Sequence, residues 1–259
     1  RMGKPASDVI EGEQLDVIIG GAPLNFAAHL QRLGCDATLI SAVGDDALGR
    51  ETLDTVRQLG LRTDGVAVLP CPTGQAVVTL DAQGTPSYDL IAGVAYDSIP
   101  LPAAGLQAQL RAGQFDALYF GTLAQRAPGS SETLHALLDM AQVRTVFCDL
   151  NIRQQFYSAQ SVRRCLAHTT ILKLSRDEAA VLTELGLLDF TPGGDAEDAR
   201  RIGQALRRQF PQLEQQLLTL DADGAAVWDA ASDALYVSDK PQVTVAATVG
   251  GGDSFGACY

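Results

Sequence analysis

Short apolar runs alternate with amphipathic helical patterns through the second half of the chain, and this alternation limits the possible folds more than any other feature. Four apolar runs predict buried parallel strands, at residues 117–120, 143–150, 169–174 and 217–220. Helical patterns separate these runs, at residues 132–141, 161–167, 177–185 and 195–210, and further strands are expected at 225–229, 235–238 and 243–247. Such an α/β alternation predicts a doubly wound, mostly parallel sheet flanked by helices, with ligands bound beyond the carboxyl ends of the strands.

The first hundred residues begin the same alternation and then depart from it. A helix is expected at 24–33, a strand at 35–43 and a second helix at 50–59. Two short runs, at 75–80 and 87–92, flank a turn that contains Gly84 and predict a β-hairpin. Prolines on both flanks of the hairpin favour one that projects as a lid over one that extends a sheet edge. These prolines are Pro70, Pro72, Pro86 and Pro100.

Composition and charge exclude several classes of function. The 259 residues, 46% of them hydrophobic, are enough for one large domain with its own core. A formal net charge of −12 argues against a nucleic-acid partner, which would favour a basic surface. No run of about 18 apolar residues occurs, so no membrane span is predicted. Five cysteines without metal-type spacing predict reduced thiols in a cytoplasmic protein.

A glycine turn near the C-terminal end of the chain is the most informative candidate site. Gly250, Gly251 and Gly252 follow a predicted strand, and Asp253 stands in the first turn of the next helix. Backbone N–H groups in such a turn converge on an anion, and the helix N-terminus adds the positive end of its dipole. The structural alternative is a glycine-rich turn in which Asp253 is an ordinary helix cap.

Two other interpretations of this turn fail. Residues 252–256 fit the G-x-S-x-G nucleophile elbow of hydrolases, but that site needs a histidine after the serine. All three histidines, His29, His135 and His168, precede it, so the hydrolase interpretation fails unless a long C-terminal part is missing. A dinucleotide fingerprint fails because Phe255 stands where the third glycine belongs, and the sequence contains no GxxxxGK[ST] phosphate loop.

A second glycine turn, Gly20-Gly21-Ala22-Pro23-Leu24-Asn25, opens the first predicted helix. Its glycines allow the backbone to approach a ligand closely, and the amide of Asn25 can both donate and accept hydrogen bonds, as a hydroxyl-rich ligand requires. A plain helix cap is the structural alternative.

Together, and in this order, the two turns resemble the signatures of the ribokinase-like (PfkB) family of carbohydrate kinases. GGAPLNFAAHLQRLG with ISAVGDDALG is similar to the first signature, and ATVGGGDSF to the second, usually written DTxGAGDxF. CDLNIR at 148–153 and LKLSRDEA at 172–179 stand where the family carries its DxNxR and KxNxxE segments. The resemblance spans residues 20–255, and GGAPxN, the AYD of Ala95–Asp97 and DLNIR are most similar to the fructokinase branch.

The resemblance implies an ATP-dependent kinase that phosphorylates a hydroxymethyl group of a free sugar, with fructose expected first. It implies Asp253 as the catalytic base, Gly250, Gly251 and Gly252 as the anion hole, and Arg153 close to the phosphates. Substrate-binding positions would be Gly20, Gly21, Asn25, Tyr96 and Asn151, nucleotide-binding positions Ser175, Thr219, Asp221 and Gly224, and Glu178 would organise Mg²⁺ through water.

Three substitutions depart from the family pattern. Ser175 replaces the Asn of KxNxxE, and Asp221 replaces a glycine of the nucleotide segment. Ala247 replaces an aspartate tied to monovalent cations, which argues against K⁺ dependence. These changes leave open a second hypothesis, a catalytically impaired sugar- or nucleotide-binding protein of the same fold.

The resemblance also predicts the domain organisation. We expect one ribokinase-like domain over 1–259, with a small β lid built from about 8–19 and 66–96. Family members carry an N-terminal strand and C-terminal helices that these residues lack, so the chain is expected to be part of a longer gene product. The resemblance further implies a homodimer formed through the lid.

Overall fold

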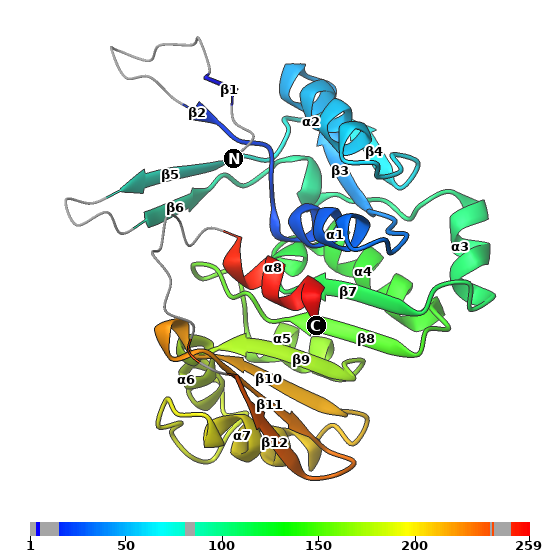
Figure 1. Ribbon diagram of the computed structural model, residues 1–259. Coiled ribbons are helices and arrows are strands. Elements are labelled where there is room, and N and C mark those ends of the chain that lie inside the picture. The colour runs from blue at the N-terminus through cyan, green and yellow to red at the C-terminus, as the bar shows by residue number, and fades with distance from the viewer. Residues whose placement is uncertain (1–3, 6–15, 81–85, 239, 241–249) are drawn as a thin grey trace. The chain divides into compact units, whose positions relative to one another are not determined.

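The computed structural model describes residues 4–5, 16–80, 86–238, 240 and 250–259 (Figure 1). The chain divides into two compact units, one of Arg1–Ala95 with Asp253–Tyr259 and one of Tyr96–Gly252. The organisation as a single domain, expected from the sequence, stays a prediction.

The larger unit is built on a six-stranded sheet in the order β12-β11-β10-β9-β8-β7 (Figure 1). Its strands are β7 (Ala117–Gly121), β8 (Thr145–Asp149), β9 (Ile171–Ser175), β10 (Gln215–Thr219), β11 (Ala225–Asp229) and β12 (Ala234–Val237). Strands β7 to β10 are parallel, whereas β11 and β12 are antiparallel. The predicted mostly parallel sheet is therefore confirmed, and the expected strand at 243–247 lies outside the described residues.

Helices of the larger unit bury apolar faces against the sheet or against one another. They are α3 (Ala104–Arg111), α4 (Pro128–Met140), α5 (Ala159–Leu166), α6 (Arg176–Glu184) and α7 (Glu197–Arg207), with 3-10 turns η2 (Leu123–Gln125) and η3 (Asp221–Asp223). Helix α7 packs so closely on β11 that a Cβ at Gly203 would overlap the ring of Trp228. A single apolar core joins the strands and helices α4 to α7, with Leu172, Leu206 and Ile202 fully buried in it.

The smaller unit contains helix α1 (Ala22–Arg32), strand β3 (Ser41–Gly44), helix α2 (Ala47–Gln58) and strand β4 (Val66–Leu69). β3 and β4 are parallel. The prediction of a strand at 35–43 is wrong over its first six residues, since β3 begins at Ser41. In the described residues this segment forms an isolated bridge from Thr38 to Arg62, and its apolar signal comes from the buried Ala37 and Leu39. Two short strands, β1 (Lys4–Pro5) and β2 (Asp16–Val17), pair antiparallel.

A hydrogen-bond cluster joins the end of β3, the start of α2 and residue 73. Asp46 caps α2 by accepting the N–H of Gly49 at 2.7 Å. Its two carboxylate oxygens also accept the hydroxyl and the N–H of Thr73, at 2.6 and 2.8 Å. The Thr73 hydroxyl in turn accepts the N–H of Gly44 at 2.9 Å. These hydrogen bonds to the charged form, led by that of the Thr73 hydroxyl, lower the pKa of Asp46.

The predicted hairpin is present as β5 (Ala76–Leu80) and β6 (Pro86–Leu90), paired antiparallel from Ala76 opposite Leu90 to Leu80 opposite Pro86 (Figure 1). The described strands place it in a two-stranded sheet of its own. Its role as a lid stays a prediction. Helix α8 (Gly251–Cys258) begins in the larger unit and continues in the smaller one.

Candidate active site

The first helix brings its asparagine to the aspartate of the last helix. Asn25 lies in the first turn of α1, where its backbone N–H donates to the carbonyl of Gly21 at 2.9 Å. Its side-chain Nδ2 donates to Oδ2 of Asp253 at 2.8 Å, although the two residues are 228 positions apart. The smaller unit thus places two sequence-predicted site residues in direct contact.

The glycines before Asn25 have separate physical reasons to be glycine. Gly21 has a φ of 116°, in the left-handed region that side chains avoid. At Gly20, a Cβ would stand 3.5 Å from Oδ1 of Asn25, so the chain runs beside that amide. Gly20, Gly21 and Asn25 therefore form one polar corner at the start of α1.

The second glycine turn opens helix α8. Gly250 has a φ of 80°, and Gly251 and Gly252 are exposed at the N-terminal end of the helix. A Cβ at Gly251 would meet no atom within 4 Å. A Cβ at Gly252 would lie 3.3 Å from Nζ of Lys173, so this glycine, unlike its neighbour, has a charged side chain against it.

Lys173 belongs to a buried ion pair that sequence analysis missed. Its Nζ lies 2.8 Å from both carboxylate oxygens of Asp149, and the two side chains are 7% and 2% exposed. The parallel register aligns Asp149 of β8 with Lys173 of β9, so the sheet itself brings the charges together. Tyr119 adds a longer hydrogen bond to Asp149, at 3.4 Å.

The loop after β8 carries two predicted site residues, Asn151 and Arg153. Asn151 is half-buried with a φ of 42°, and Arg153 is exposed, its Nη1 donating to the carbonyl of Ile152 at 3.1 Å. The N–H of Ile152 donates to Oε1 of Glu178 at 2.6 Å, which fixes the loop to the start of α6.

Glu178 is held by a capping box at the start of α6. Its Oε2 accepts the N–H of Ser175 at 2.7 Å, and the Ser175 hydroxyl accepts the N–H of Glu178 at 3.3 Å. The serine that replaces the family asparagine thus serves as a helix cap. Each carboxylate oxygen of Glu178 has accepted one N–H and keeps a second lone pair for a water.

The lone pairs left on the Glu178 carboxylate fit the role predicted from the sequence, in which this residue would hold a divalent cation through water. Mg²⁺ dehydrates reluctantly and keeps several of its waters in protein sites. Within the described residues, no three His, Cys, Asp or Glu side chains are grouped as direct metal ligands.

The predicted nucleotide segment follows β10, beside the start of α6. Thr219 pairs in register with Ser175 of the parallel strand β9, so both lie at the carboxyl end of the sheet. Asp221 has a φ of 53° and Gly224 a φ of 94°, and the turn is closed by a 2.8 Å hydrogen bond from Leu220 N–H to the Gly224 carbonyl. The left-handed backbone at 221 gives a physical reason for a glycine there, and aspartate is among the residues that tolerate it.

A charged cluster lies next to this turn. Asp223 accepts from Arg176 at 2.7 Å and from Lys240 at 2.9 Å. Arg176 first, and then Lys240, lower the pKa of Asp223 to about 2. Asp223 is therefore ionised throughout the neutral range.

Tyr96, the remaining sequence-predicted substrate position, lies in the 3-10 turn η1 (Ala95–Asp97) and is half-buried. Its ring centre is 4.5 Å from Cζ of Arg126. Burial raises the pKa of Tyr96, so its hydroxyl is neutral and able to donate at physiological pH. Ala247, the position connected with K⁺, lies outside the described residues.

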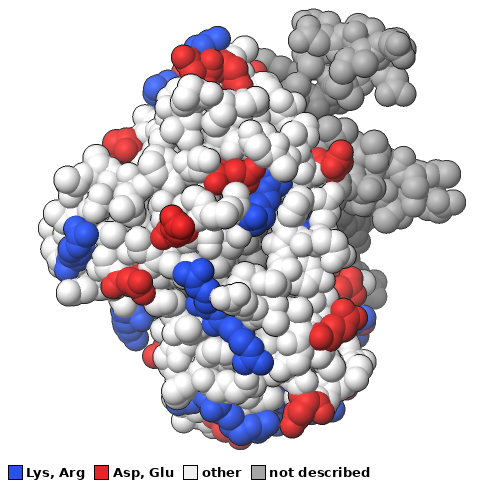
Figure 2. Space-filling view, turned by 180° about the vertical axis from the view of Figure 1, so that it is seen from behind, with Lys and Arg blue, Asp and Glu red and all other residues white. Residues whose placement is uncertain are grey.

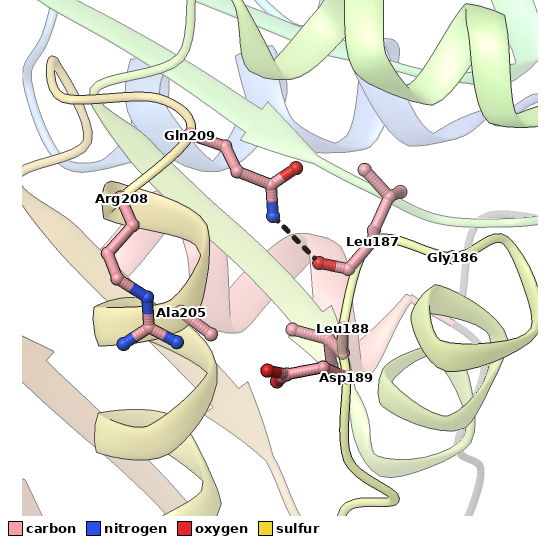
Figure 3. Close-up of a pocket in the computed structure, with 7 residues that line it drawn as sticks. All are labelled: Gly186, Leu187, Leu188, Asp189, Ala205, Arg208 and Gln209. Atoms are coloured by element: carbon pink, nitrogen blue, oxygen red, sulfur yellow. Dashed lines mark hydrogen bonds between the residues drawn. The ribbon is translucent and has the colours of Figure 1, made fainter.

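A pocket of about 200 Å³ lies elsewhere on the larger unit, between the segment after α6 and the end of α7 (Figure 3). Gly186, Leu187, Leu188, Asp189, Ala205, Arg208 and Gln209 line it. Gln209 donates across it to the Leu187 carbonyl at 3.0 Å. None of the sequence-predicted site residues lines this pocket.

The surface charge is mixed. On the face in Figure 2, the described Lys and Arg residues are interspersed with Asp and Glu and do not form a continuous basic stripe. None of the helices in the described part of the chain is both long and apolar enough to cross a membrane.

The larger unit, with polar loops beyond the carboxyl ends of parallel strands, has an α/β architecture, and in such open sheets ligands are generally bound at that edge. A comparison with protein-family models assigns the chain more specifically than the fold does. Residues 3–259 match the model of the pfkB family of carbohydrate kinases, and the chain belongs to that family. The resemblance predicted from the motifs is confirmed.

Relatives with assigned names are sugar kinases. A fructokinase of Rhizobium leguminosarum bv. trifolii is 28% identical over 247 residues, which cover 92% of this chain and 69% of the relative. The structure of a Xylella fastidiosa fructokinase with bound ATP has a TM-score of 0.77 at 22% identity, covering 95% of this chain and 72% of that one. The structure of a Vibrio cholerae O395 fructokinase with fructose, ADP and calcium ion bound has a TM-score of 0.73 at 21% identity. The match covers 92% of this chain and 74% of that one. These likenesses establish a ribokinase-like fold.

Proposed function

We propose that the protein transfers the γ-phosphoryl group of ATP to a hydroxymethyl group of a free sugar, with fructose as the first candidate. The observation that carries the proposal is the 2.8 Å hydrogen bond from Asn25 to Asp253. It joins the polar corner at the start of α1, suited to a hydroxyl-rich ligand, to the one carboxylate of the glycine-opened helix α8. The fructokinase names of the relatives support the same substrate class.

Asp253 would act as the general base. The Nδ2 of Asn25 takes one lone pair of Oδ2 and fixes the orientation of the carboxylate, which keeps further lone pairs to accept the proton of the sugar hydroxyl. As that proton moves to Asp253, the sugar oxygen forms a bond to the γ-phosphorus and the bond from the γ-phosphorus to the β–γ bridging oxygen breaks, releasing ADP. An alcohol does not ionise near neutral pH, so base help of about 10²–10⁴-fold is expected from this carboxylate.

The glycine turn would hold the charge that develops on the transferred group. Gly250, Gly251 and Gly252 present backbone N–H groups at a helix N-terminus, where the dipole favours negative charge. Donors fixed in advance stabilise such charge without reorganisation, and this is usually the largest single contribution to phosphoryl transfer.

The loops after β8, β9 and β10 would bind the nucleotide and its metal. Ser175, Thr219 and Gly224 lie together at the carboxyl edge, with Arg153 on the neighbouring loop. Glu178 would hold Mg²⁺ through water with the lone pairs that its two backbone hydrogen bonds leave. The bound cation would neutralise phosphate charge.

The test is sugar-dependent ADP release with MgATP across fructose, glucose, ribose, 2-keto-3-deoxygluconate and adenosine. Asp253→Asn should lower kcat by about 10²–10⁴-fold, because it removes the base. Sugar binding, measured by calorimetry, should persist in this variant. Asp54→Asn is the matched control, since Asp54 is an exposed aspartate of α2 paired with Arg57 on that helix surface, and it should leave turnover unchanged.

The outcomes separate the two hypotheses drawn from the sequence. Sugar-dependent turnover that is lost in Asp253→Asn and kept in Asp54→Asn supports the kinase and identifies its substrate. Unchanged turnover in Asp253→Asn would refute the assigned base. Absence of turnover with every sugar, while sugar or ATP still binds, would support the impaired binding protein instead.

A further inference from the structure

Arg126 is an arginine buried almost completely beside Tyr96. Its side chain is 3% exposed and that of its partner Asp97 is 9% exposed. The guanidinium and carboxylate meet as two forks, Nε to Oδ1 at 2.6 Å and Nη2 to Oδ2 at 2.9 Å. A charge with so little exposure cannot reach a ligand in solvent, so any effect of Arg126 on a ligand must pass through the residues that it contacts.

Two aromatic rings contact the guanidinium. Its Cζ lies 4.5 Å from the centre of the Tyr96 ring and 4.9 Å from that of Phe156. Tyr96 precedes the ion-paired Asp97, and Phe156 belongs to the loop that also carries Asn151 and Arg153. Arg126 therefore joins two segments on which sugar-binding positions were predicted.

The backbone around Tyr96 is fixed as well. The hydroxyl of Ser130, a residue 2% exposed in the first turn of α4, donates to the Tyr96 carbonyl at 2.7 Å. The same hydroxyl accepts the N–H of Ile99 at 2.8 Å. Ser130 holds the main chain of Tyr96, and Arg126 holds the neighbouring Asp97. The main motion left to Tyr96 is rotation of its side chain, which the guanidinium beside the ring restricts.

We infer that Arg126 is a positioning residue for sugar recognition, which sets the orientation of the Tyr96 ring through the stacked guanidinium and the Asp97 ion pair. This inference rests on the proposed function. An arginine is required because its planar fork can bind a carboxylate in two places and stack on rings at the same time, whereas a lysine supplies only a point charge.

The variant that tests this is Arg126→Lys, which keeps the charge and removes the plane. Its KM for the sugar should rise about 10- to 100-fold, because small displacements of a positioning group have effects of this size. Its kcat at saturating sugar and its KM for ATP should stay within about 3-fold of the wild type, since the base and the nucleotide segment are untouched. Arg57→Lys is the matched control, an exposed arginine paired with Asp54.

A double-mutant cycle with Tyr96→Leu distinguishes positioning from a general loss of stability. If Arg126 acts through Tyr96, adding Arg126→Lys to Tyr96→Leu should raise the sugar KM no further than Tyr96→Leu alone. If Arg126→Lys does not fold, Asp97→Asn loosens the same fork with the arginine in place and should show the same rise confined to the sugar KM.

An unchanged sugar KM in Arg126→Lys, additive effects in the cycle, or a fall in kcat that only follows the folded fraction would each overturn the inference. These results require a wild-type protein that turns over or binds a sugar. A wild type that does neither would refute the proposed function, and the inference would fall with it.

Discussion

Replacing Gly252 with alanine tests whether the start of α8 is fitted against the buried ion pair of Lys173 and Asp149. Neither Gly251 nor Gly252 has a positive φ, so alanine is conformationally allowed at both. Only at 252 would the added Cβ meet a neighbour, Nζ of Lys173 at 3.3 Å. Gly251→Ala and Gly252→Ala therefore add the same methyl group to neighbouring positions, and only the one at 252 contacts Lys173.

The expected magnitude follows from how Lys173 is held. A distance of 3.3 Å is tighter than an ordinary van der Waals contact, so the ammonium or the turn must move by a few tenths of an ångström. The ammonium cannot retreat without lengthening its two 2.8 Å bonds to Asp149 inside the protein. Overpacking of this kind costs about 1–3 kcal/mol. If the glycine turn yields, donors fixed for the transferred group are displaced, and kcat should fall about 10- to 100-fold.

The assay compares kcat and the urea-unfolding free energy of Gly252→Ala and Gly251→Ala. Because Gly251 belongs to the same proposed anion hole, the comparison is relative: Gly251→Ala should lose clearly less kcat than Gly252→Ala, and it should gain up to about 1 kcal/mol of stability from helix propensity. Perturbing Lys173 directly would be less informative, because an unpaired buried Asp149 costs about 3–5 kcal/mol by itself. Equal kcat values for the two alanine variants would refute the reasoning.

Three further predictions concern the frame around the site. Gly203→Ala should lower the unfolding free energy by about 1–3 kcal/mol, because its Cβ overlaps the Trp228 ring, and a gain in urea unfolding would contradict this. Asp46→Asn should cost about 1 kcal/mol at pH 7. Since folding lowers the pKa of Asp46, that stabilisation is fully present above its ordinary pKa of about 4 and is lost as the pH falls below it, so the difference between the two proteins should shrink with falling pH, whereas a constant difference would contradict the linkage. Asp221→Gly should relieve a left-handed backbone, worth up to about 1 kcal/mol, and should tighten ATP binding by removing a carboxylate; weaker binding in calorimetry would contradict this.

The parallel core could be predicted from sequence because its strands are short, continuous apolar runs between amphipathic helices. Leu172 and Leu174 of β9 are completely buried, as such runs require. Helix α3 was missed because its eight residues include Gly105 and two glutamines, and only Leu106 and Leu110 are buried. Strand β4 was missed because its four residues are mostly half-buried and lie beside the proline-rich flank of the hairpin.

The candidate site was predictable in a different way. The glycine turns and Asp253 follow from motifs whose local backbone has few alternatives. The ion pairs of Arg126 with Asp97 and of Lys173 with Asp149 join residues 29 and 24 positions apart, and no local periodicity marks them. Sheet register and helix packing bring those partners together, so their pairing becomes visible only with the fold.

The contact between Asn25 and Asp253 also has a consequence for biosynthesis. At about 5–20 residues per second, a ribosome adds Asp253 roughly 10 to 50 seconds after Asn25. During that interval Asn25 of helix α1 lacks its hydrogen-bond partner Asp253, while the larger unit is translated in full. A chain interrupted between Val237 and Asp253 contains all six strands of the larger sheet and still lacks the carboxylate that the asparagine holds.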